Sequence, residues 1–408
     1  MQSRIVIFVV LALLARCSSL GAPLTNATVD FEPNLPLIFL DAKEQIVSDR
    51  KVPCTVKLVS PGQTNTASPL TGVVRFHGAT SQAYEKKSFG LTIDKPVALA
   101  GLSESAHYVL NAAFVDRSLM RHKLSYDLFR SLSSPGNKRF AAASRFVEVY
   151  FNGKYRGAYL LMERVDRRLL QLHPYSSNEV SHAVIYKAID HAANFGQSGH
   201  AGYEQREPDP AAVPYWRPLD EFNKFVSSAP DAQFFDPQTG ISSRLDLDNA
   251  IDFHLLVLLT SNMDGITKNF IFTRDATVPT NPHLKFFFAP WDYDATFGRN
   301  WEASRVAPTA WLSNHLFDRL LGNPAYRDRF VARWKELRDK QFSVKTVRQM
   351  IDDNAKTLGD AALRNAQRWR AQAASLADRL SFEEDIKEMK DWIADRIQWL
   401  DGAIAKVR

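Results

Sequence analysis

Four polar residues lie in two short segments whose residue types and spacing suit metal-dependent chemistry. Asp264 and Asn269 belong to NMDGITKNFIF, and Asp292 and Asp294 belong to FAPWDYDATFG. Carboxylate and amide oxygens are hard ligands of the kind that Mg²⁺ takes, together with substrate phosphates. The thiol and imidazole ligands that zinc prefers are missing from both segments. A single aspartate at such a position more often caps a turn or a strand end, so the interest lies in the combination.

The elements around these segments predict that the two segments meet. Residues 247–260 are apolar and open with Asp248 as a predicted N-cap, which indicates a buried helix. Residues 270–273 predict a strand, and after the turn DATVPTNP the chain returns as a second strand, HLKFFFAPW. In a hairpin, the loop that enters the first strand and the loop that leaves the second lie at the same end. Connectivity therefore predicts that the four polar residues lie side by side.

Such a group supplies the parts that phosphoryl transfer requires. An acid accepts the proton of the attacking hydroxyl, and further ligands hold a metal ion on the phosphates. The spacing Asp-x-x-x-x-Asn of Asp264 and Asn269 is that of the protein-kinase catalytic loop, without the His-Arg that precedes the Asp there. The aspartates at the end of the returning strand supply the remaining metal ligands.

Composition and the N-terminus limit the setting of this chemistry. The chain has 408 residues, 45% of them hydrophobic, which is enough for one bilobal domain or two smaller ones. Its net charge of +6 suits anionic ligands but is too diffuse to predict nucleic-acid binding. Residues 1–22 predict a cleavable signal peptide, so we expect a secreted, periplasmic or cell-surface protein with no transmembrane segment in the mature chain. Lipidation at Cys17 is a minor alternative, and cleavage would leave Cys54 without a disulfide partner.

The remaining patterns predict an α+β protein with two lobes of different composition. Residues 23–68 are rich in Pro, Thr and Ser and predict an extended arm. Residues 69–165 predict a small, mostly β lobe, with a helix from about Arg117 and a hairpin turn at Asn152-Gly153. Residues 166–408 predict a larger, mainly helical lobe that carries the four polar residues. Its loop-rich first part contains evenly spaced histidines, which favour a surface insertion over a metal site: His173, His182, His191 and His200.

Five groups of segments resemble the spore coat protein H (CotH) kinase family. They are RFHGATS with YEKKSFGLTID, HYVLNAAFVDRSLMRHKLSYDL, VEVYFNGKYRGAYLLMERVD, NMDGITKNFIF and FAPWDYDATFG. The resemblance runs from about Val73 to Leu400. It implies a two-lobed atypical protein-kinase-like fold with a helical C-terminal region, ATP with Mg²⁺ or Mn²⁺, and phosphorylation of Ser or Thr in a secreted or surface protein.

Carried over by position, the resemblance implies a role for each polar residue. Asp264 resembles the acceptor of the substrate hydroxyl proton, and Asn269 resembles a ligand of metal or phosphate. Asp292 resembles the metal-binding aspartate of the WDYD motif. Asp294 is then a second metal ligand or an orienting group.

Further positions are expected to bind the nucleotide. Lys87, on the strand KKSFGLTID, is the candidate for neutralising phosphate, and Lys86 is the alternative because neighbouring strand residues face opposite sides. Met162 and Glu163 end a strand at the junction of the lobes, where the backbone is expected to meet adenine. Arg121 is expected away from the buried face of its helix, where it meets phosphate or pairs with a local carboxylate.

Two other functions fit the same residues. A metal-dependent glycosyltransferase would use Asp292-Tyr293-Asp294 as an Asp-x-Asp motif on a sugar nucleotide, but it needs an α/β sheet whose first strands bind the nucleotide, and the first lobe shows no such alternation. A surface or coat protein without catalysis would instead bind a host or structural partner. Nucleotide binding and the transfer of label from ATP distinguish the three.

Overall fold

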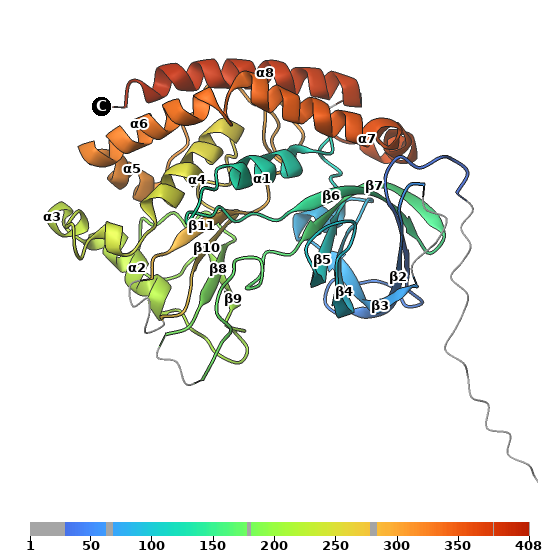
Figure 1. The fold of residues 1–408 in the computed structure, drawn as a ribbon, viewed down its shortest axis with the longest axis horizontal. Coiled ribbons are helices and arrows are strands. Elements are labelled where there is room, and N and C mark those ends of the chain that lie inside the picture. Colours follow the sequence, from blue (N-terminus) through green and yellow to red (C-terminus); the bar gives the residue numbers. More distant parts are fainter. Residues whose placement is uncertain (1–28, 63–67, 178–180, 278–283, 378, 408) are drawn as a thin grey trace, which may run out of the picture.

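The computed structural model describes residues 29–62, 68–177, 181–277, 284–377 and 379–407. The predicted signal peptide and Cys17 lie outside these residues. A strand barrel forms one part of the molecule, and a second sheet with most of the helices forms the other (Figure 1). The predicted α+β class is confirmed.

The barrel contains seven strands in the order β1-β2-β3-β4-β5-β7-β6, and the parallel pairing of β6 with β1 closes it. Alternate residues of these strands, such as Val74, Leu91 and Val149, point inward and form its apolar core. The first two strands come from the segment predicted to be an arm, and they complete the barrel wall. The strands are β1 (Leu37–Asp41), β2 (Val52–Val59), β3 (Leu70–His77), β4 (Ser88–Val97), β5 (Ser105–Asn111), β6 (Ser144–Phe151) and β7 (Lys154–Glu163).

The predicted hairpin turn at Asn152-Gly153 is confirmed between β6 and β7. Both residues have positive φ, +49° for Asn152 and +71° for Gly153. A two-residue turn of this kind matches the twist of the strands it joins, and Asn followed by Gly adopts it at low cost. This local signal therefore specified the pairing of two barrel strands.

Cys54 lies inside the barrel on β2 and is 6% exposed. Burial raises the pKa of its thiol to about 12, and the nearby Asp94 carboxylate adds to the shift. Since the thiolate is the reactive form, we expect Cys54 in the folded mature chain to react with a disulfide reagent about 10³-fold more slowly than in the denatured chain. Thiol release followed with and without denaturant measures this ratio, and Cys54→Ala gives the background. Equal rates in both conditions would contradict the buried position.

The second sheet contains β8 (Val184–Ala188), β9 (Tyr203–Glu207), β10 (Phe270–Arg274) and β11 (Phe287–Pro290). Its order is β11-β10-β8-β9, and every pair is antiparallel. One face packs on the main core, where the rings of Phe253 and Phe288 stack at 4.7 Å. The other face carries a smaller apolar cluster that includes Ile185 and Ile271. The sequence predicted three of these strands and missed β9.

Helices cover the second sheet and extend over the barrel (Figure 1). In Figure 1, α7 and α8 lie side by side across the top of the molecule, and α7 reaches the barrel. There Trp369 donates from Nε1 to the Arg156 carbonyl at 2.8 Å, and Arg364 pairs with Glu148 at 2.7 Å. None of the described helices combines the length and hydrophobicity that crossing a bilayer requires. They are α1 (Arg121–Ser131), α2 (Arg217–Ser228), α3 (Asp231–Phe234), α4 (Leu247–Thr260), α5 (His315–Gly322), α6 (Pro324–Asp339), α7 (Val344–Ala373) and α8 (Phe382–Ile404).

The first helix departs from its prediction in both its start and its orientation. It begins at Arg121 rather than near Arg117, because Leu119 has φ +59° and Asp116 folds the preceding residues into a turn. The Asp116 carboxylate accepts the N–H groups of Ser118 at 3.0 Å and of Arg121 at 2.8 Å. This later start turns Arg121 into the interior, where it is 1% exposed, so its predicted place off the buried face was wrong.

Candidate active site

The helix α4 leads directly into the loop that carries Asp264. Its N-cap is Asp246, whose carboxylate accepts the N–H of Asn249 at 3.0 Å. The predicted cap, Asp248, instead lies in the first turn and pairs with Arg329 at 2.5 Å. The helix itself spans the predicted residues, so the error concerns only the cap.

The C-terminal end of α4 is held by a buried arginine of α8. Arg396 donates to the carbonyl of Leu258 from Nε at 2.8 Å and from Nη2 at 2.6 Å. A cation at this end satisfies carbonyl groups that have no partner within the helix and complements its dipole. The chain then leaves the helix at Ser261, where φ is +51°. The direction in which the next loop starts is therefore set by a helix more than a hundred residues later in the chain.

The two predicted segments lie at the same end of the β10–β11 hairpin, joined by their backbones. The N–H of Trp291 donates to the carbonyl of Asn269 at 3.1 Å. The amide of Asn262 donates to the carbonyl of Asp292 at 3.3 Å, while its oxygen accepts the N–H of Gly265 at 2.9 Å. The predicted pairing of these strands is confirmed. The loop of Asp264 and the loop of Asp292 are thereby adjacent.

Asp264 lies near the surface with two basic neighbours. Its side chain is 17% exposed, and its carboxylate oxygens lie 3.2 Å from Lys268 Nζ and 3.7 Å from His191 Nε2. The other ring nitrogen of His191 contacts the Thr267 hydroxyl at 2.7 Å. The carboxylate of Asp264 is therefore accessible to a hydroxyl of a second molecule, which a proton acceptor requires.

The second loop holds Asp292 in an uncommon backbone conformation. Asp292 has φ +58° and an exposed side chain, and its N–H donates to Tyr126 Oη at 3.0 Å. The same hydroxyl lies 3.2 Å from Nε2 of His122, which comes from the same helix, α1. A positive φ costs a non-glycine residue conformational free energy. The buried Tyr126 and His122 of α1 therefore help to hold the backbone of Asp292 in this conformation.

Asp294 is a half-buried carboxyl close to other acids. Its burial, together with the negative charges of Asp292 and Asp116, raises its pKa well above the usual range. Two carboxyl groups side by side disfavour ionisation of both, and a cation between them would relieve this repulsion. The chemistry of the pair therefore fits a metal-binding role.

The donor set around the hairpin suits a metal that is completed by its substrate. Asn269 lies at the end of the loop that contains Asp264 and has φ +59°. Its N–H donates to the carbonyl of Ala188 at 3.0 Å. Within the part of the chain that the structure describes, no three His, Cys, Asp or Glu side chains converge as a complete metal site. Mg²⁺ is bound in kinases by few protein oxygens, with phosphates and water as the other ligands. Asn269, Asp292 and Asp294 fit that pattern and do not fit zinc.

The comparison with known proteins identifies the family of the chain. The CotH kinase protein family matches residues 74–400. The chain belongs to this family. A curated relative is the inner spore coat protein H of Bacillus subtilis (strain 168), which is 29% identical over 294 residues, or 68% of this chain and 73% of the relative.

In this member of the CotH family, the two candidate lysines both donate to groups of the protein itself. Both precede β4, which begins at Ser88. Lys87 donates to the carbonyl of Gln82 at 2.6 Å. Lys86 is 2% exposed and donates to the carbonyls of Ala112 at 2.6 Å and Ala158 at 2.5 Å, and to the Asn365 side chain at 2.9 Å. Lys86 thus joins the barrel to α7.

The guanidinium of Arg121 is fully engaged inside the CotH domain. It pairs with Asp116 at 2.5 Å and with Asp385 of α8 at 2.5 Å, and its Nε donates to the carbonyl of Thr296 at 3.0 Å. Of the two roles expected for this residue, the geometry matches pairing with carboxylates. Because Thr296 follows Asp294 by two positions, Arg121 supports the candidate site without facing it.

Met162 and Glu163 lie at the junction of barrel and helical part, as expected. Met162 is paired on both sides, with Val109 of β5 and with Ser144 of β6. The N–H of Glu163 donates to the carbonyl of Ala143 at 2.9 Å, and its carboxylate accepts the Ala143 N–H at 3.0 Å. The N–H of Glu163 is therefore already hydrogen-bonded within the protein, and the predicted contact with adenine stays a prediction.

Sequence reasoning missed three basic residues around His77, one of which contacts a hairpin loop. Arg75 lies on β3, Arg164 follows β7, and Lys187 lies on β8 with Nζ 4.5 Å from the ring centre of Trp291. The ring of His77 lies 6.5 Å from the same indole. One signal was present, because Lys187 interrupts the otherwise apolar strand sequence AVIYKAI. The other two residues gave no local signal.

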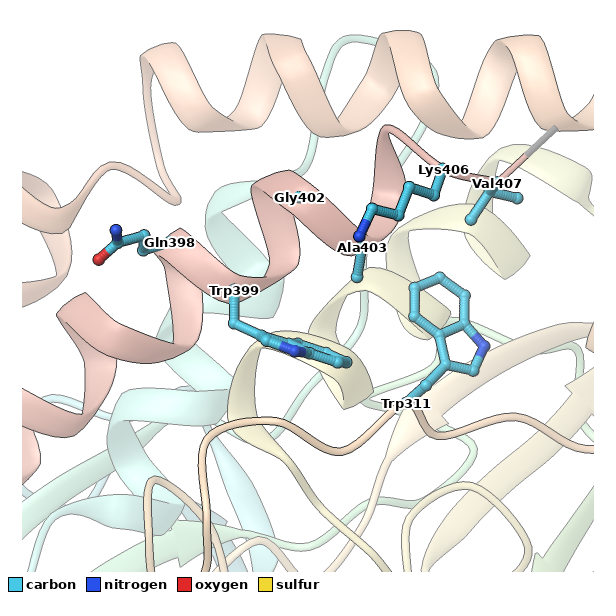
Figure 2. Close-up of a pocket in the computed structure, with 7 residues that line it drawn as sticks. All are labelled: Trp311, Gln398, Trp399, Gly402, Ala403, Lys406 and Val407. Atoms are coloured by element: carbon cyan, nitrogen blue, oxygen red, sulfur yellow. The ribbon is translucent and has the colours of Figure 1, made fainter.

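A pocket of about 530 Å³ lies elsewhere in the CotH domain, at the end of α8. Figure 2 shows the rings of Trp311 and Trp399 along it, with Lys406 and Val407 beside them. None of the candidate catalytic or metal-binding residues lines this pocket. It is separate from the hairpin loops.

Proposed function

We propose that this CotH family member is a protein kinase that transfers the γ-phosphate of ATP to a Ser or Thr hydroxyl of a secreted or surface protein. The proposal includes a requirement for Mg²⁺ or Mn²⁺ and a two-lobed, atypical kinase-like organisation, with the barrel as the small lobe. The single observation that carries it is the hydrogen bonding between the 262–269 loop and the 291–294 loop, which brings together the segments that carry Asp264, Asn269 and Asp292.

The proposed roles follow from exposure and charge. Asp264 accepts the proton as the substrate hydroxyl attacks the γ-phosphorus, while the bond from that phosphorus to the bridging oxygen of ADP breaks. Lys268, 3.2 Å from the same carboxylate, adds positive charge beside the transferred group. Asn269, Asp292 and Asp294 hold the metal, which when bound neutralises phosphate charge.

Removal of divalent cations is expected to abolish the transfer. Without a metal, no cation joins the carboxyl groups of Asp292 and Asp294 to the phosphates, so the triphosphate binds weakly and out of line. Transfer of label from γ-labelled ATP, measured with EDTA and after re-addition of Mg²⁺, Mn²⁺ or Zn²⁺, checks this. We expect full recovery with the first two ions only. Undiminished transfer in EDTA would rule out the metal roles.

The principal test is label transfer by the purified mature chain to proteins of its own secreted or surface fraction, with Mg²⁺ present. Label in phosphoserine or phosphothreonine supports the proposal. Release of phosphate to water alone would make the protein an ATPase. A wild-type chain that neither binds ATP nor transfers label would overturn the proposal.

A second candidate is a surface or coat protein without catalysis. It is favoured by the name of the curated relative, inner spore coat protein H, which describes a coat component. It predicts no ATP binding and an unchanged partner affinity in Asp292→Asn. The glycosyltransferase is not proposed, because the first lobe is a barrel with mainly antiparallel pairs and not the α/β sheet that such an enzyme needs.

A further inference from the structure

Three basic side chains lie close enough to His77 to act on its charge, and none of them binds a carboxylate in the part of the chain that the structure describes. Arg75 and Arg164 come from the barrel, and Lys187 comes from the second sheet. All three are half-buried. Among the described residues, none of them forms an ion pair or donates a hydrogen bond, whereas half-buried arginines such as Arg333 and Arg364 do. A cation that loses water without gaining a partner is unfavourable, so these positions are typical of an anion site.

The strand patterns place Arg75, His77 and Lys187 on the outward faces of their strands. On β3, Val74 belongs to the barrel core, so Arg75 and His77 point outward. On β8, the neighbours of Lys187 on either side belong to the main core, so Lys187 points to the opposite face of its sheet. Lys187 Nζ and the His77 ring both contact Trp291, the residue before Asp292. The outward faces of two separate sheets therefore meet at the candidate metal site.

A glycine keeps the space beside Arg75 open. Gly90 of β4 is the strand partner of Arg75. A Cβ atom at Gly90 would lie 3.8 Å from both Arg75 Cγ and His77 Nδ1. A side chain at this position would therefore pack against both Arg75 and His77. Glycine leaves these two side chains without that neighbour.

The electrostatics of His77 support this convergence. Burial, together with the positive charges of Lys187, Arg164, Arg75 and Arg206, lowers the pKa of His77 to about 4. Arg206 is already paired with Glu204 at 2.8 Å. The cations of both sheets thus act on one imidazole, as they would on a ligand placed beside it.

Carboxylates also face this space, but at longer range. Asp292 and Glu204 favour the charged form of Lys187, and Asp166 and Glu207 favour that of Arg164. Burial still lowers the pKa of both Lys187 and Arg164, which means that these acids do not compensate for lost hydration. A metal ion bound by Asp292 would neutralise the negative charge of that carboxylate.

We propose that Lys187, Arg75 and Arg164 form a two-sided cradle for the triphosphate of the nucleotide, with Lys187 nearest the metal. This inference rests on the proposed function and assigns the phosphate-binding residues of the same site. Three cations on two walls match a chain of phosphates better than a single phosphate, which one arginine fork can hold. The cradle replaces Lys86 and Lys87 in this role.

Binding of inorganic tripolyphosphate and of ATP, each with Mg²⁺, tests the cradle without relying on catalysis. We expect Lys187→Met and Arg164→Gln each to weaken both ligands by about 10-fold or more, since each removes a charge-assisted contact. Adenosine should bind these variants as it binds the wild type. Isothermal titration of the full mature chain measures all three ligands, and thermal unfolding confirms that the variants are folded.

Lys87→Met is the matched control, because it removes the same charge from a residue that donates to the carbonyl of Gln82. It should bind tripolyphosphate as the wild type does. Normal binding by Lys187→Met together with weak binding by Lys87→Met would overturn the cradle while leaving the kinase intact. Tripolyphosphate binding that depends on Lys187, without phosphate transfer by the wild type, would overturn the kinase and retain the cradle. Failure of the wild type to bind either ligand would overturn both.

Discussion

Asp264→Asn is expected to lower the rate of phosphoryl transfer by about 10²- to 10⁴-fold, the range typical of a lost general base. Asparagine keeps the size of the side chain and removes its ability to take a proton. Its present contacts are near-surface ion pairs at 3.2 and 3.7 Å, which contribute little to stability, so the fold should survive. Initial rates of label transfer at saturating ATP measure the effect.

Asp292→Asn is expected to have a similar effect for a different reason, because it weakens the metal site. If both residues act in one step, the double variant should be no slower than the slower single variant. Asp275→Asn is the control, since Asp275 lies just beyond the opposite end of β10 and contacts His173 at 2.7 Å. Wild-type rates in both Asp264→Asn and Asp292→Asn would show that the hairpin loops are not the site of transfer.

Asp385→Ala is expected to cost about 3–5 kcal/mol of unfolding free energy, the usual effect of removing one partner from a buried ion pair. Asp385 is fully buried, and both of its oxygens accept from Arg121, at 2.5 and 2.7 Å. Its loss leaves the Arg121 guanidinium buried with Asp116 as its remaining carboxylate. Urea denaturation followed by tryptophan fluorescence measures the change.

The control for this variant is Asp395→Ala, an exposed position on the same helix, which should change stability by no more than about 0.5 kcal/mol. Arg121→Ala combined with Asp385→Ala should cost less than the sum of the single variants, because the two side chains share one interaction. If the losses of unfolding free energy in the two single variants simply add in the double variant, the contact between Arg121 and Asp385 contributes no stability of its own.

The same pair predicts a pH dependence of stability. Although burial opposes it, the charges of Arg121 and Arg299 lower the pKa of Asp385 in the folded chain. A carboxyl group with a lowered pKa in the folded state contributes its full stability above the ordinary value of about 3.9, and the contribution is lost as the pH falls through the folded value. The stability gap between the wild type and Asp385→Ala should therefore narrow in acid. A constant gap down to the lowest accessible pH would contradict the assigned pairing.

The site illustrates which contacts a sequence reveals. The meeting of the Asp264 and Asp292 loops followed from two strands joined by one turn, so their hydrogen bonds join residues that the chain's connectivity already relates. The contacts of Arg121 and Lys187 could not be predicted from connectivity. One of the carboxylates that bind Arg121 lies 264 positions later, on α8. Lys187 of β8 and His77 of β3 lie beside the same indole, Trp291, only because the two sheets approach each other there.

The sequence by itself determined the elements whose causes are local: the α4 helix, the Asn152-Gly153 turn, the β10–β11 hairpin and the order of family motifs. These depend on periodicity, turn chemistry and connectivity over a few dozen residues. Tertiary structure alone decided that β1 and β2 close the barrel, that Arg121 is buried, and which basic side chains surround Trp291. Those outcomes depend on the packing of distant elements. Burying a charge costs desolvation free energy, and the partners that offset this cost come from elsewhere in the chain, where no local sequence pattern indicates them.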